Sequence, residues 1–150
     1  MYYRLCFHKG GGPDEGDSNR LMSRIIRWWT HGKYTHVELQ RDGAQCFSAS
    51  GYENVVRWKQ IRFSHPERWD FVNLDLTMLE DIMILKRIDR ILGSKYDYLG
   101  AVTCPWRGAH VDHRWYCSEA CAWALGVRPS NISPTNLWRY MKVHDGKVTV

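Results

Sequence analysis

Two of the five cysteines stand four residues apart in the segment WYCSEACAWALG. The surrounding pattern predicts a helix over 114–126 that is ended by Gly126, so Cys117 falls in or near the first turn. Unpaired N–H groups and a partial positive charge at a helix N-terminus favour a thiolate over a thiol. The same N–H groups can stabilise an oxyanion. Cys117 is therefore a candidate nucleophile, whereas Cys121, one turn further in, is expected to be a buried packing residue.

A cysteine nucleophile needs a base, and His36 is the best candidate in this sequence. It lies in YTHVELQ, at 34–40, which predicts a strand. If Val37 and Leu39 face the core, alternation places His36 and Glu38 together on the opposite face. A polar pair of this kind suits the wall of a cleft. A solvated strand face is the alternative explanation.

These two segments resemble signatures of the permuted NlpC-like cysteine hydrolases of the papain fold, in which the histidine strand precedes the cysteine helix. THV at 35–37 matches a Ser/Thr-His-Val strand, and YCSEA at 116–120 matches a Tyr/Phe-Cys-Ser-Glu-Leu/Ala helix. YDYLGAV at 96–102 resembles the Tyr-Asp segment of that family, and the helix predicted before the histidine strand fits as well. The resemblance covers about residues 2–140.

The resemblance implies a dyad in which Cys117 is the nucleophile and His36 is the base and later the acid. The third member in the family is a polar residue, often on the strand after the histidine strand. Here that strand, AQCFSAS at 44–50, contains no carboxylate. As the third member, Glu38 ranks slightly above Ser48, because a carboxylate stabilises an imidazolium better than a hydroxyl does. The short separation of Glu38 from His36 along the strand argues against its reaching the far ring nitrogen.

The implied chemistry is acyl transfer, and the expected function is hydrolysis of an amide bond through an acyl-enzyme. Cell-wall peptide is the first substrate suggested, by analogy with the family. The same dyad could hydrolyse lipid esters or thioesters, or transfer an acyl group to an amine. Tyr34, Tyr96 and Tyr116 are expected to line the substrate cleft, although Tyr34 and Tyr96 could equally be core aromatics. This chemistry requires no cofactor and no metal.

Zinc binding is an alternative for the same region. Cys104, His110, His113, Cys117 and Cys121 form the pattern C-x5-H-x2-H-x3-C-x3-C. Four of these side chains could make a tetrahedral site. The spacing matches no common zinc finger, so this alternative ranks below the hydrolase.

A binding module without catalysis is the second alternative. Arg20, Arg24 and Arg27 form a stripe beside Trp28 and Trp29 that could contact phosphates. A solvated helix face explains the stripe more simply, so nucleic acid is not an expected partner. The third alternative is a degenerate papain-like domain that binds its ligand without cleaving it. The intact cysteine and histidine argue against this alternative.

The whole chain supplies enough residues for one domain over 1–150 with a substantial core. Apolar residues make up 44% of the 150 and charged residues 25%, with a formal net charge of +5. The N-terminus is too short and polar for a signal peptide, and no apolar run approaches the ~20 residues of a membrane span. A cytoplasmic location is expected, or association with a virion or release at lysis if a phage encodes the protein.

Segregated strands and helices predict the α+β class, with a small antiparallel sheet packed against the cysteine helix in a papain-like arrangement. Thr77 and Glu80 form a capping box before the helix expected to end at Gly93. Strands are predicted at 2–7, 34–40, 44–50, 54–61, 69–76 and 147–150, and helices at about 19–31, 78–93, 96–103, 114–126 and 133–141.

Overall fold

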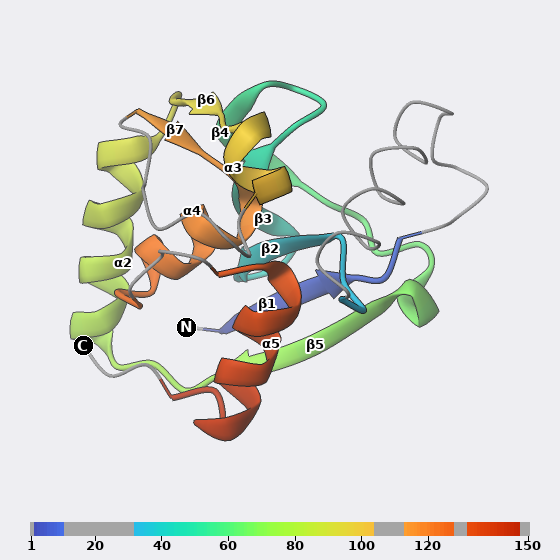
Figure 1. The fold of residues 1–150 in the computed structure, drawn as a ribbon. Helices are drawn as coiled ribbons and strands as arrows, with labels where there is room; N and C mark the ends of the chain where they lie inside the picture. Colours follow the sequence, from blue (N-terminus) through green and yellow to red (C-terminus); the bar gives the residue numbers. More distant parts are fainter. Residues whose placement is uncertain (1, 11–31, 104–112, 128–131, 148–150) are drawn as a thin grey trace.

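The computed structural model describes residues 2–10, 32–103, 113–127 and 132–147 (Figure 1). The described residues form an α+β fold around a five-stranded antiparallel sheet with the strand order β4-β3-β2-β1-β5. The strands follow five of the predicted segments closely: β1 (Tyr3–His8), β2 (His36–Arg41), β3 (Gln45–Ser50), β4 (Val55–Gln60) and β5 (Trp69–Leu74).

Helices and short elements complete the described part of the chain. A 3-10 turn, η1 (Pro66–Arg68), precedes β5, and two short strands, β6 (Lys95–Tyr96) and β7 (Arg114–Trp115), pair in parallel. The helices are α2 (Met78–Ile91), α3 (Tyr98–Thr103), α4 (Cys117–Ala124) and α5 (Pro134–Val143). The helix predicted over 19–31 and residues 148–150 of the last predicted strand lie outside the described residues.

Local signals account for the ends of the longest helix. The Thr77 hydroxyl accepts a hydrogen bond from the Glu80 N–H, and the Glu80 carboxylate accepts one from the Thr77 N–H at 2.7 Å. This reciprocal pair is the predicted capping box. At the other end the cap is Leu92, one position earlier than predicted, and Gly93 follows it with φ of +82°. Glycine adopts this left-handed conformation without steric cost.

The core lies between one face of the sheet and the helices. Leu5, Leu39 and Phe47 occupy adjacent positions on β1, β2 and β3 and are fully buried. α4 contacts β2 and β3 on one side and α2 on the other (Figure 1). The alternate residues of β2, Glu38 and Gln40, point to the opposite face and are buried too. A charged side chain on β2 therefore needs partners inside the protein.

The ladder between β2 and β3 stops before the strands end. Its cross-strand pairs run from Arg41–Gln45 to Leu39–Phe47, so the Val37 carbonyl is not paired by the ladder. The Ser48 hydroxyl donates to this carbonyl at 2.7 Å, and the Cys121 thiol lies 3.8 Å from it. A second contact of 3.7 Å joins the Cys121 sulfur to the Phe47 carbonyl. Side chains thus replace ladder hydrogen bonds where α4 approaches the sheet.

The predicted helix at 114–126 is shorter than expected. Residues 114 and 115 form β7, because they pair with β6, which is distant in sequence. The helix α4 begins at Cys117, with Tyr116 as its N-cap. The last helix starts as predicted, with the Ser133 side chain accepting a hydrogen bond from the Asn136 N–H at 3.2 Å. No helix within the described part of the chain is long and apolar enough to cross a membrane.

Candidate active site

Cys117 is the first residue of α4, and its immediate neighbours hold the start of that helix in place. The Glu119 carboxylate accepts a hydrogen bond from the Tyr116 N–H at 3.4 Å. The Ser118 hydroxyl donates to the Ile132 carbonyl at 2.6 Å. The first N–H groups of a helix have no partner within the helix, and Cys117 stands at this end of α4. The side chain is buried, so its reactive surface is small.

His36, the first residue of β2, lies next to Cys117 and Glu38. Its side chain keeps 28% of its surface exposed, and its Nε2 atom is 2.8 Å from the Glu38 Oε1 atom. Cys117 interacts with the same ring and raises its pKa. The structure therefore brings together Cys117, His36 and Glu38.

The charges around His36 favour its imidazolium form. Burial by itself would lower the pKa of His36. The electrostatic and hydrogen-bond interactions with Cys117, followed by those with Glu38, outweigh burial and raise the pKa to about 10. Cys117 and Glu38 together thus favour the protonated ring.

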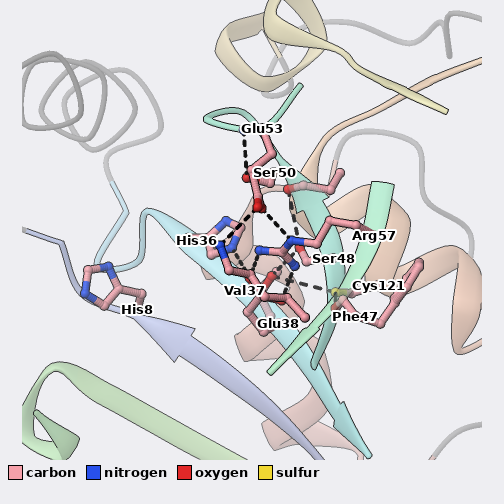
Figure 2. Close-up of polar contacts among 12 residues, drawn as sticks. His8, His36, Val37, Glu38, Phe47, Ser48, Ser50, Glu53, Arg57 and Cys121 are labelled. Atoms are coloured by element: carbon pink, nitrogen blue, oxygen red, sulfur yellow. Dashed lines mark hydrogen bonds and ion pairs between the residues drawn. The ribbon is translucent and has the colours of Figure 1, made fainter. Parts of the chain in front are cut away.

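Glu38 is almost completely buried, with 1% of its side chain exposed, and Arg57 of β4 neutralises it. The guanidinium donates from Nη1 to Oε2 and from Nη2 to Oε1, each at 2.9 Å (Figure 2). Burial alone would raise the pKa of Glu38. Hydrogen bonds and positive charge from His36 and Arg57 lower it below its ordinary value instead. Glu38 is thus an anion held by two cationic partners.

Arg57 was absent from the sequence-based candidates. The sequence did contain a signal for Arg57. A single carboxylate on a strand that is buried on both faces requires a cationic partner, and alternation places few cationic residues of the next strands on the same face. Arg57 lies directly opposite Ser48 in the β3–β4 ladder. Its pairing with β2, two strands away, follows only from the order of strands in the sheet. Its Nε atom donates to Glu53 at 2.9 Å, and Glu53 also accepts from Lys59 at 3.0 Å.

Ser48, the other candidate for the third position, lies elsewhere. Its hydroxyl is buried and donates to the Val37 carbonyl, which places it at the opening of the β2–β3 ladder beside Cys121. Burial raises the pKa of the Cys121 thiol well above its ordinary value. Cys121 is therefore a neutral packing group between α4 and the sheet, as its interior position in the helix predicts.

The three tyrosines expected to line a cleft are all buried. Tyr34 donates its hydroxyl to Asp70 at 2.5 Å and packs against Trp138. Tyr96 packs edge-to-face against Tyr98 at a centroid distance of 4.9 Å. Tyr116 caps α4. Their positions suit the alternative of core aromatics, and contact of any of them with substrate stays a prediction.

His8 is the cross-strand partner of His36 on β1. Its ring packs against Trp69 at a centroid distance of 4.6 Å. Burial, the nearby positive charge of His36 and that of Arg68 lower the pKa of His8 to about 4. Near neutral pH the site therefore has one charged and one neutral imidazole side by side.

The alternatives of zinc and nucleic acid depend largely on residues outside the described ranges. Cys104, His110 and the arginine stripe at 20–27 all lie there. Of the proposed zinc ligands that are described, His113 is exposed and Cys121 is buried against backbone carbonyls. Within residues 2–10, 32–103, 113–127 and 132–147, no three His, Cys, Asp or Glu side chains are grouped to hold a metal ion.

Comparisons with known proteins leave the family undetermined. No protein-family model matches this chain, and no curated protein sequence matches it at a significant level of similarity. The resemblance to permuted NlpC-like hydrolases therefore stays a prediction, carried by the short motifs around His36 and Cys117.

Proposed function

We propose that this protein is a cysteine hydrolase of the permuted NlpC-like, papain-fold type that cleaves an amide bond through an acyl-enzyme. The observation that carries the proposal is the position of His36, whose Nε2 atom is 2.8 Å from the Glu38 carboxylate and whose ring also interacts with Cys117, the first residue of α4. The three groups come from two elements, β2 and the first residue of α4. A thiol, an imidazole and a carboxylate in this order form a nucleophile, a base and an orienting group.

The proposed reaction proceeds in two acyl-transfer steps. The Cys117 thiolate attacks the substrate carbonyl, and backbone N–H groups at the start of α4 hold the oxyanion. The His36 imidazolium then donates its proton to the leaving amine as the carbon–nitrogen bond breaks. In the second step neutral His36 takes a proton from water, the resulting hydroxide attacks the thioester, and the Cys117 thiolate is released. Glu38 keeps Nε2 engaged throughout, so Nδ1 is directed at the sulfur.

The order of elements supports the papain-like assignment. The histidine strand precedes the cysteine helix in sequence, and α4 packs against that strand and its neighbour β3. Cell-wall peptide remains the first substrate class, by family analogy. Lipid esters, thioesters and acyl transfer to an amine use the same three groups, so the site alone does not rank them.

Trapping the acyl-enzyme tests this function directly. The protein is incubated with separate pools of muropeptides, lipid esters and isopeptides, quenched in acid, and measured as intact mass and by peptide mapping. With one of the pools we expect an acyl adduct on Cys117, and the product of that pool should be released faster than the products of the other pools. Cys117→Ala and His36→Ala should abolish turnover, and Cys121→Ala is the matched control.

The rate of iodoacetamide alkylation at each cysteine supplies a test that needs no substrate. Cys117 should be alkylated faster than Cys6, Cys46 and Cys121, and the difference should vanish in His36→Ala. Equal rates at all thiols of the wild-type protein would refute the assignment of the nucleophile. An adduct that forms but turns over only in the presence of an amine would indicate a transferase instead.

A further inference from the structure

The Glu38 carboxylate has little access to water, so its ionised form depends on its neighbours. Only 1% of its side chain is exposed. An isolated buried carboxylate would take up a proton, and a neutral carboxyl group would support an imidazolium poorly. His36 cannot supply the compensating charge alone, because it changes its own charge during the proposed reaction. A permanent cation beside Glu38 is therefore required.

Arg57 meets this requirement with a defined geometry. Its two terminal nitrogens bind the two oxygens of Glu38, and both distances are 2.9 Å. A bidentate arginine–carboxylate pair fixes the plane of the carboxylate as well as its charge. Oε1 accepts from Arg57 and also lies 2.8 Å from the His36 Nε2 atom. Because one oxygen atom of Glu38 contacts both groups, the orientation of the guanidinium also determines the orientation of the imidazole ring.

The surface end of Arg57 is held as well. Its side chain is 15% exposed, and its Nε atom donates to Glu53, whose other oxygen accepts from Lys59. Hydrogen bonds to Arg57 and Lys59 lower the pKa of Glu53 to about 2, so this carboxylate stays charged over the neutral range. Each of the three guanidinium nitrogens therefore donates to a carboxylate.

Other titratable groups near this pair leave the charge balance unchanged. The thiols of Cys6, Cys46 and Cys121 approach Glu38 from β1, β3 and α4. Burial raises the pKa of each, that of Cys46 to about 12, so they are neutral near pH 7. His36 is flanked by Cys117 of α4, and by His8 of β1, which is neutral near that pH.

We propose that Arg57, supported by Glu53, is a positioning residue that keeps Glu38 anionic and oriented so that His36 faces Cys117. The inference rests on the proposed function and adds a residue outside the three reacting groups. Arg57 touches neither His36 nor Cys117 in the described contacts and acts through Glu38 alone. Its removal should change how His36 titrates, which a merely structural ion pair would not do.

The test compares Arg57→Gln and Arg57→Lys with wild type, using the alkylation rate of Cys117 against pH and the titration of His36 followed by NMR. In Arg57→Gln we expect the pH midpoint of the Cys117 alkylation rate to rise by about one unit, which corresponds to a tenfold weaker thiolate–imidazolium pair. The imidazolium signal of His36 should disappear at a lower pH. Arg57→Lys restores charge without the bidentate geometry and should recover part of both effects.

Arg41→Gln is the matched control, since Arg41 makes a similar ion pair with Asp81 at the other end of β2. It should lower stability without changing either readout. If Arg57→Gln does not fold, Arg57→Lys decides the question by the same measurements. A folded Arg57 variant with wild-type alkylation and His36 titration would overturn the role of Arg57. A wild-type protein whose Cys117 reactivity is unaffected by His36→Ala would overturn the proposed function instead.

Discussion

The carboxylate of Glu38 reaches the far ring nitrogen of His36, at 2.8 Å, although the two residues are only two positions apart on β2. Alternate residues of a strand lie about 7 Å apart at their Cα atoms, on the same face. The Glu38 and His36 side chains must therefore lean toward one another to meet. The bidentate contact with Arg57 fixes the Glu38 carboxylate in the orientation that permits this.

The first prediction separates the two candidates for the third position. Glu38→Gln keeps the shape of the side chain and removes its charge, so the imidazolium of His36 loses support. We expect the pH midpoint of the Cys117 alkylation rate to rise by at least about one unit. Ser48→Ala should leave that rate unchanged and lower the free energy of unfolding by about 1 kcal/mol, because the Val37 carbonyl loses its donor. The reverse pattern would assign the position to Ser48.

The second prediction concerns the titration of His36. Because Cys117 and Glu38 raise its pKa to about 10, the ring should stay protonated through pH 8. Cys117→Ala removes the largest of the raising influences, so deprotonation should occur at a lower pH. Histidine ring signals in two-dimensional NMR report this directly. A wild-type ring that loses its proton near pH 6.5, the ordinary value, would contradict the ion pair.

The third prediction concerns stability in acid. The pKa of His8 in the folded protein is about 4, below its ordinary value of 6.5, so the unfolded chain binds more protons between these values. Stability from this group is complete above pH 6.5 and is lost as the pH falls toward 4. A pKa difference of this size corresponds to about 3 kcal/mol, and partial exposure of the ring reduces it, so we expect a loss of about 2 kcal/mol over this interval by chemical denaturation. His8→Phe, which keeps a ring against Trp69, should reduce that slope.

The fourth prediction concerns the packing around the N-terminus of α4, the helix that begins with Cys117. A Cβ atom on Gly100 would meet the Asp97 carboxylate and would lie 3.1 Å from the ring of Tyr116, the N-cap of α4. Gly100→Ala should therefore cost about 1–3 kcal/mol of stability and lower the alkylation rate of Cys117. Gly43→Ala is the control, since it strains a residue with φ of +65° but has no neighbour within 4 Å. It should cost stability while the Cys117 rate is unchanged.

The sequence by itself was sufficient for the elements whose signals are local. Alternating apolar residues predicted the five strands of the sheet, and the Thr77–Glu80 box predicted the start of α2. The α+β class followed from the order of these elements. The placement of Cys117 near a helix N-terminus and of Cys121 inside the helix also depended only on near neighbours. Such features are encoded within a few residues, so they can be found without knowing what packs where.

The tertiary structure decided which of those residues meet. The pairing of β6 with β7 shortened the predicted cysteine helix and made Cys117 its first residue. The end of the β2–β3 ladder directed Ser48 to a backbone carbonyl, and the strand order brought Arg57 to Glu38. These contacts join residues that are 11 to 19 positions apart, and their partners are selected by burial and charge balance. No local pattern specifies that selection, because the cost of burying a charge exists only once the sheet is assembled.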